Sequence, residues 1–234
     1  MVKKLDQWCD NLWIIFMCLV GGMTLITLIL NWNVWPVGAK AGAFGAIIMP
    51  LHVIEEWKFP GGLHYIYNVL FGSKKYGSRY LDRYPMSRFT DMLTNIGLVV
   101  FPLIFLALAL LAGLSAEIAV CIMLFGLLEL CAHIAVGIYS YRRYHAAGKR
   151  TIYDPGLGTS ILLFLPASIY ILCNLPALTL GNWIGGIVAM AVMAVFCVPV
   201  AETPFKGWVL KQKDDAFAFK SPKYYAKFVT KDRY

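Results

Sequence analysis

The sequence predicts an all-α polytopic membrane helix bundle with about six transmembrane helices. Hydrophobic residues make up 59% of its 234 residues and charged residues only 15%, whereas about a quarter of the residues in a soluble domain are charged. The mean hydropathy is +0.65. The apolar residues also gather in runs close to the ~20 residues that a helix needs to cross a ~30 Å hydrocarbon core. These observations exclude a soluble or a disordered protein.

The first expected span, residues 13–30, contains no charged residue and follows two lysines. Because no small-residue cleavage site comes after it, we expect a retained helix and not a cleaved signal sequence. The second span, residues 41–57, is the least apolar and carries ionisable residues near its end. The third, residues 92–112, follows a basic and aromatic segment that we expect to lie along the membrane surface.

The fourth expected span covers residues 118–139. The turn Tyr153-Asp154-Pro155-Gly156 leads into the fifth, residues 158–175. Asp and Pro at such a position are typical of a helix start, so we expect an ordinary turn there. The sixth span covers residues 183–200 and precedes a stretch rich in lysine and aromatic residues.

Positive charges predict the orientation of the chain in the membrane. Of the 21 Lys and Arg residues, 20 lie before the first span or after the second, fourth and sixth, and only Lys40 lies on the other side. The positive-inside rule therefore puts both termini in the cytoplasm. We expect a multi-pass protein of the cell membrane, in which residues 1–205 form one transmembrane domain. Residues 206–234 are expected to be a basic cytoplasmic tail, lying on the membrane surface or disordered.

This topology also accounts for the net charge of +8, together with attraction to anionic lipid headgroups. The basic residues frame the spans and form no domain of their own, so the sequence predicts no nucleic-acid partner. The expected partners are the lipid bilayer and a lipid-like substrate, and the oligomeric state is left open. The six cysteines include no C-x-x-C pair and are expected to be packing residues without disulfides.

Ionisable residues inside the expected spans are few, and each is costly unless it is paired or bound. At 100° per residue, His52, Glu55 and Glu56 share one face of the second span. Glu129 and His133 lie one turn apart on one face of the fourth. Both groups fall in the cytoplasmic halves of their spans, so we expect them to meet in the cytoplasmic leaflet.

Other polar residues surround this predicted cluster. Asn95 lies one or two turns into the third span, and we expect it either at the catalytic site or in an interhelical hydrogen bond. Tyr153 could close the site and contact a substrate. Glu202 lies where the sixth span ends and is expected to be solvated, with a place at the site as the alternative. His64 and His145 lie in interfacial segments and are expected to be solvated.

Imidazole and carboxylate groups suit zinc, iron or manganese, and paired Glu and His residues on facing helices are how bundle proteins build metal sites. The sequence therefore predicts a divalent metal, zinc or iron, with five candidate ligands: His52, Glu55, Glu56, Glu129 and His133. They could hold one metal with a free carboxylate as general base, or two bridged metals. A metal-free acid–base site and purely structural pairing are the alternatives.

The string LHVIEEW (residues 51–57) resembles the signature of the HXXEE-domain family of small bacterial multi-span membrane proteins. The further match covers roughly residues 40–200 and includes Asn95, the pair Glu129 and His133, and the turn with Tyr153, Pro155 and Gly156. The resemblance implies a helical membrane domain, with no stated substrate or reaction. A fainter similarity is to CAAX-type intramembrane glutamate proteases, which have an Arg one turn after a Glu pair. This chain has Lys58-Phe59-Pro60 there.

The leading functional hypothesis is an intramembrane metal-dependent hydrolase that acts on a lipid-like or membrane-borne substrate at the cytoplasmic leaflet. His52, Glu129 and His133 would be metal ligands. One of Glu55 and Glu56 would complete the ligand set, and the other would be a general base that activates water. The alternatives are a di-iron membrane oxidoreductase, a metal-free glutamate-type intramembrane peptidase, and a proton- or cation-coupled transporter.

Overall fold

A computed structural model describes residues 2–212 and 215–229, and this part of the chain is helical with no strand. Six helical segments in it are long and apolar enough to cross a membrane, which confirms the predicted fold class. Each expected span lies within one of these segments or extends beyond it by a single residue. The segments are α2 (Leu12–Leu30), α3 (Val37–Trp57), α6 (Arg88–Leu111), α7 (Ser115–Tyr144), the run of α8 (Leu157–Thr159), η3 (Ser160–Phe164) and α9 (Leu165–Asn174), and the run of α10 (Leu180–Val195), η4 (Phe196–Val200) and α11 (Ala201–Leu210).

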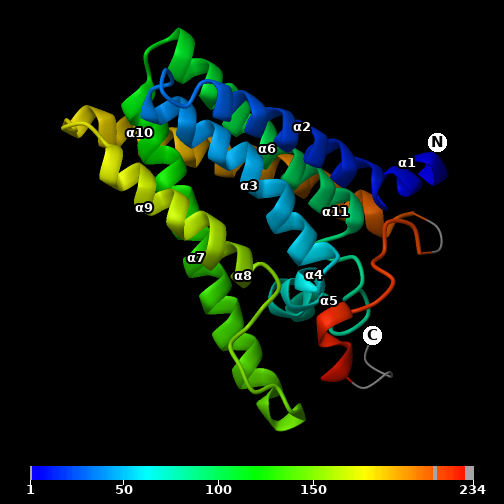
Figure 1. Cartoon of the computed structure of the whole chain (residues 1–234). Coiled ribbons are helices and arrows are strands. Elements are labelled where there is room, and N and C mark those ends of the chain that lie inside the picture. Colours follow the sequence, from blue (N-terminus) through cyan, green and yellow to red (C-terminus); the bar gives the residue numbers. More distant parts are fainter. Residues whose placement is uncertain (1, 213–214, 230–234) are drawn as a thin grey trace.

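Helix α3 is the centre of the bundle and packs against α2, α6, α7 and α9 (Figure 1). Small residues allow this close packing. A Cβ added at Gly42 would lie 2.8 Å from the carbonyl oxygen of Pro102 in α6, and one added at Gly45 would lie 2.9 Å from the Pro102 ring. Close backbone approach through glycine is a common way for membrane helices to associate. The ionisable residues of α3 are thereby held between neighbouring helices.

The lipid-facing surface is formed by the outer helices. Large apolar side chains on α2 and α10 are exposed in the structure, among them Phe16 at 60%, Leu19 at 62% and Ile184 at 54%. Such a surface is unfavourable in water and favourable in hydrocarbon. The structure therefore agrees with a multi-pass membrane protein, and the identity of the membrane stays a prediction.

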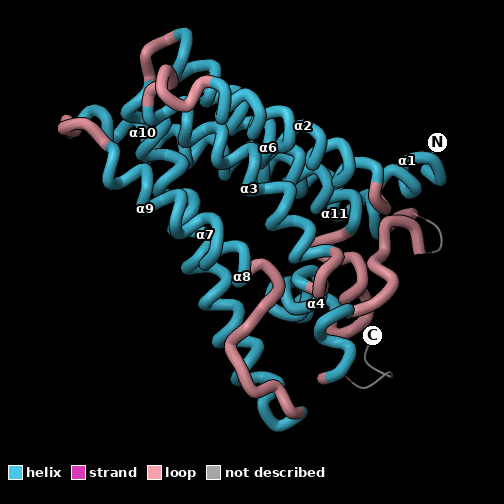
Figure 2. The backbone as a smooth tube through the Cα atoms, viewed as in Figure 1, coloured by secondary structure: helices cyan, strands magenta, loops and turns pink. Residues whose placement is uncertain are grey.

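Helices α7 and α9 diverge from α2, α3 and α6 towards one end of the bundle (Figure 1). Short elements gather at that end, and loops connect them (Figure 2). They are α1 (Val2–Trp8), α4 (Leu63–Tyr67), η1 (Asn68–Gly72), α5 (Ser73–Tyr76), η2 (His145–Ala147) and η5 (Lys223–Lys227). Both ends of the described chain also lie there, which agrees with the expectation that the termini share one side (Figure 1).

The prediction of a surface-lying or disordered tail is wrong for the part of the tail that the structure describes. Helix α11 extends to Leu210, and residues 215–229, here called the C-terminal segment, fold back onto the bundle. Phe217 is completely buried, with its ring 5.3 Å from that of Phe89 and 5.4 Å from that of Trp208. The aromatic residues that suggested a membrane surface instead pack into the protein core. Residues 213–214 and 230–234 lie outside the described part.

The C-terminal segment also explains why one prediction for a histidine is wrong. His64 was expected to be solvated, but it is only 3% exposed, because its ring stacks on Phe219 with 3.7 Å between centroids. Arg88 fastens the same region by donating a hydrogen bond of 2.7 Å to the Ala218 carbonyl and pairing with Asp6 at 2.5 Å. His145 is exposed, as predicted.

Candidate metal centre

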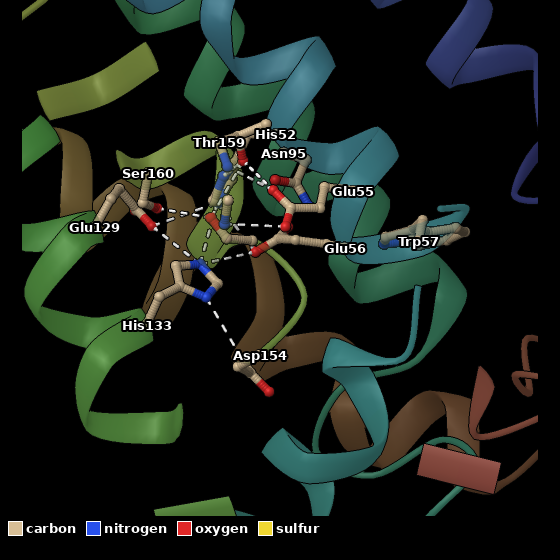
Figure 3. A network of polar contacts seen from close by, with 12 residues as sticks. His52, Glu55, Glu56, Trp57, Asn95, Glu129, His133, Asp154, Thr159 and Ser160 are labelled. Atoms are coloured by element: carbon tan, nitrogen blue, oxygen red, sulfur yellow. Dashed lines mark hydrogen bonds and ion pairs between the residues drawn. The ribbon is translucent and has the colours of Figure 1, made fainter. Parts of the chain in front are cut away.

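Two helices bring four ionisable side chains together inside the bundle. His52 and Glu56 lie one turn apart on α3, Glu129 and His133 lie one turn apart on α7, and the four side chains point towards one another (Figure 3). The two imidazole Nε2 atoms are 3.2 Å apart. Both histidines and Glu56 are buried, and the Glu129 side chain is 21% exposed. The predicted meeting of α3 and α7 is therefore present in the structure.

The distances within this group match those in a metal coordination sphere. Glu56 Oε1 lies 3.1 Å from His52 Nε2 and 3.3 Å from His133 Nε2. Glu129 Oε2 lies 3.6 Å and 3.8 Å from the same two nitrogens. Zinc bound tetrahedrally at ~2.0–2.2 Å holds its ligand atoms about 3.3–3.6 Å apart. His52, Glu129 and His133 alone form a group that could hold a metal ion, since their ligand atoms all lie within 4.8 Å of one another.

A hydrogen-bond chain behind His52 orients its ring. His52 Nδ1 lies 2.8 Å from Thr159 Oγ1, and this hydroxyl donates a 2.6 Å hydrogen bond to Glu55 Oε2. The same hydroxyl lies 3.1 Å from the Gly156 carbonyl, so both acceptors around it draw its hydrogen away from His52 and leave Oγ1 to accept the Nδ1 hydrogen. In the neutral ring this tautomer keeps a lone pair on Nε2, as a metal ligand requires. Thr159 was not among the predicted site residues.

Glu55 and Glu56, which the sequence left equivalent, occupy different surroundings. Glu55 accepts hydrogen bonds from the Tyr153 hydroxyl at 2.8 Å, from the Gly158 amide at 3.0 Å and from the Thr159 amide at 2.6 Å, besides the Thr159 hydroxyl. Both its oxygens are occupied by the turn before α8 and by α8 itself. This geometry favours Glu56 as the carboxylate at the centre and makes Tyr153 a support for Glu55.

A second carboxylate supports His133. Asp154 is completely buried, and its Oδ2 lies 3.5 Å from His133 Nδ1. Neither atom has a hydrogen-bond partner among the described residues, whereas Asp154 Oδ1 accepts a hydrogen bond from the Tyr225 hydroxyl. Burial raises the pKa of Asp154, and His133 and Tyr225 oppose that shift. Metal-bound histidines usually give their second N–H to such a carboxylate, so this buried pair fits a metal on His133 Nε2.

The turn at Asp154 leads into α8, as expected, and it also lies directly against His133. Gly156 makes this approach possible. It has φ +103°, and a Cβ added there would collide with the His133 ring. Only glycine adopts this conformation without strain and leaves room for the imidazole. No motif of the sequence marks Asp154 or Thr159 as site residues, because their roles depend on how the turn folds.

A cavity of about 470 Å³ lies beside the four ionisable side chains. Asn95 lines it and donates both hydrogens of its amide to Asp91, at 3.0 Å to the carbonyl oxygen and 2.9 Å to Oδ1. Glu202 also lines it and is 2% exposed, so the prediction of a solvated Glu202 is wrong. Its helix continues through η4 into α11, which places Glu202 inside the bundle, 2.9 Å from Lys206.

Comparisons with known proteins identify one family. The model of the family described as "Protein of unknown function with HXXEE motif" matches residues 43–171, which include all the residues of the four-membered group and the turn before α8. Neither the curated proteins nor the solved structures give a match to this chain.

Proposed function

This chain belongs to the family of proteins of unknown function with an HXXEE motif, and we propose that it is an intramembrane metal-dependent hydrolase acting on a lipid-like or membrane-borne substrate. The observation that carries the proposal is the convergence of two imidazole nitrogens and two carboxylate oxygens from α3 and α7. Five of the six distances between these atoms lie between 3.1 and 3.8 Å. A metal ion bound among these atoms would account for their similar spacing around a common centre.

In this proposal His52, His133 and Glu129 hold the metal, zinc or iron. Bound there, it would supply Lewis acidity and lower the pKa of a water molecule. The Glu56 oxygen stands at the fourth corner of the group, 3.1 and 3.3 Å from the two histidine nitrogens, so a water molecule that takes its place there would lie within reach of this carboxylate. Glu56 then accepts a proton from the water and returns it to the leaving group, as a general base and acid do in hydrolysis.

The cavity supports a substrate with a long apolar part. Apart from the ionisable residues, its lining is mainly apolar, for example Leu70, Phe71, Leu98, Ala135 and Val136. Phe71 is 56% exposed, and Ala135 is also exposed, so the apolar lining continues to the surface of the bundle. In a membrane such a rim is compatible with entry of a lipid from the side. The positive-inside rule puts this end of the bundle at the cytoplasmic leaflet.

Metal analysis of the purified protein tests the proposal. We expect about one zinc or iron per chain in the wild type and its loss in His52→Ala and His133→Ala. His145→Ala is the matched control, because His145 is exposed and follows the last residue of α7, about three helical turns beyond His133. Absence of zinc, iron and manganese from the wild type, or unchanged metal in both histidine variants, contradicts the proposal. Two irons per chain favour the di-iron oxidoreductase instead.

The support of His133 gives a second measurement. Asp154→Asn keeps the size of the side chain but removes the charge opposite His133 Nδ1, and loss of such a support costs about 10–100-fold in metal affinity. Competition with a chelator measures this change. For the reaction itself, lipid mass spectrometry should detect a lipid that accumulates in cells with Glu56→Gln and disappears with the wild type. No lipid difference between these cells would contradict hydrolysis of a membrane lipid.

A further inference from the structure

The wall of the cavity beyond the four-membered group carries further polar side chains. Asp91 and Asn95 come from α6 and Glu202 comes from α11, and their exposed fractions are 5%, 3% and 2%. All three line the same cavity as His52 and Glu129. We call Asp91, Asn95 and Glu202 the acceptor wall, because they present hydrogen-bond acceptors to the cavity.

The hydrogen bonds of the acceptor wall leave acceptors facing the cavity. Asp91 accepts hydrogen bonds from Trp57 Nε1 and from the Asn95 amide. Because that amide gives its hydrogens to Asp91, the Asn95 carbonyl oxygen is left, and no described residue donates a hydrogen bond to it. The Thr94 hydroxyl donates its shorter hydrogen bond, 2.8 Å, to the Cys197 carbonyl and lies 3.3 Å from one oxygen of Glu202. The Lys206 ammonium lies 2.9 Å from the other oxygen. An incoming molecule therefore meets oxygen atoms with free lone pairs.

The charge of the cavity points the same way. Among the described residues, no Lys or Arg lines it, whereas four carboxylate residues do, beside the two histidines: Glu56, Asp91, Glu129 and Glu202. One of them, Glu202, is paired with Lys206, which lies outside the lining. Tyr67 lies at this wall, and burial together with the nearby Glu202 and Asp91 raises the pKa of its hydroxyl. A phosphate or carboxylate headgroup would bring a further negative charge against these carboxylates in a medium of low dielectric constant. An ammonium or hydroxyl group would meet complementary partners.

We propose that the cavity binds a long-chain lipid whose polar end donates hydrogen bonds and carries a positive charge, as a primary amine does. The amine lies against the acceptor wall, and the hydrocarbon chain follows the apolar lining formed by Leu70, Phe71, Leu98 and Val136. The inference deepens the proposed function by naming a substrate class. The role of the amine lipid as a substrate rests on the proposed function, whereas its binding does not, because binding by these residues needs no metal.

The test uses the full-length protein in phosphatidylcholine nanodiscs, freed of metal by a chelator. The two probes are octadecylamine and octadecyl phosphate, each with a doxyl spin label on the chain, and electron paramagnetic resonance measures the immobilised fraction. Empty nanodiscs give the background. The net charge of +8 favours nonspecific binding of the phosphate probe, so a preference for the amine must come from a local site. We expect the amine to bind at least 10-fold more tightly than the phosphate.

Two variants and one control locate the site. Asp91→Asn and Glu202→Gln keep the side-chain volumes and should each weaken binding of the amine about 5- to 10-fold. Glu117→Gln is the matched control, because Glu117 lies in the first turn of α7 and pairs with Asn182, outside the cavity lining. Equal or tighter binding of the phosphate overturns the proposal, and so does an equal effect of all three variants. If the protein binds the amine but contains no metal as purified, this inference is upheld and the proposed metal-dependent hydrolase fails. If the purified protein contains the metal but does not prefer the amine, the proposed hydrolase is upheld and this inference fails.

Discussion

Gly156 decides how closely the turn before α8 approaches His133. Gly156→Ala should reduce metal affinity at least 10-fold, because the added methyl group would collide with the imidazole and the backbone has φ +103°. Gly148→Ala is the control for backbone strain alone, since Gly148 has φ +95° and no atom within 4 Å of an added Cβ. Chelator competition and thermal unfolding of both variants check this prediction. Equal metal affinity in the two variants would show that the contact with His133 is unimportant.

The residues of the centre that could be predicted from the sequence are those that one helix places by itself. His52 and Glu56, and likewise Glu129 and His133, are four residues apart, and the 3.6-residue period puts each pair on one face. Glu55 and Glu56 could not be distinguished, because the difference lies in the hydrogen bonds from the turn at Tyr153, Gly158 and Thr159 to Glu55. These contacts join residues about a hundred positions apart, which no local pattern encodes.

At the scale of the elements, the C-terminal segment is held partly through a neutral histidine. Burial lowers the pKa of His64 to about 3; nearby Lys223 adds to the shift, and a hydrogen bond with the Ser221 backbone opposes it. An unfolded or undocked histidine has a pKa of about 6.5. The undocked state therefore binds a proton first, so docking is fully stable above about pH 6.5 and weakens as the pH falls from there.

We expect the C-terminal segment to open about tenfold more often at pH 5.5 than at pH 7.5. The free energy of docking falls by about 1.4 kcal/mol for each pH unit below the pKa of the undocked histidine, and pH 5.5 lies about one unit below that pKa. Proteolysis within residues 215–229 under conditions of fast reclosing measures this opening. The aromatic variant His64→Phe can still stack on Phe219 and cannot titrate, so its opening should not change over the same range. A pH dependence that persists in His64→Phe would assign the effect to another group.

The helices themselves could be predicted well, whereas the C-terminal segment could not. Hydropathy identifies an element that lipid surrounds, and the six spans are long apolar runs of that kind. The segment alternates lysines with aromatic residues, and its burial depends on partners such as Phe89, Trp208 and His64 from other elements. The same alternation is typical of a membrane-surface segment, so composition alone favours the wrong place for it.

At the scale of the whole molecule, the orientation in the membrane is a prediction from charge. With 20 of 21 basic residues on one side, a C-terminal green fluorescent protein fusion should fluoresce in a bacterial host. Alkaline phosphatase fused after Val34, between α2 and α3, should be active, because that loop is expected on the outer side. Active phosphatase at the C-terminus would reverse the orientation and move the candidate centre to the outer leaflet.

The hydrogen bond from Tyr225 to Asp154 has a consequence for biosynthesis. The ribosome makes α3 and α7, which carry the four ionisable side chains, well before it makes Tyr225, which follows the last membrane helix in the chain. A nascent chain can therefore bring those side chains together in the membrane while Asp154 still lacks its phenol partner. Maturation of the centre is then a late step, completed only when the translated C-terminal segment leaves the ribosome and docks.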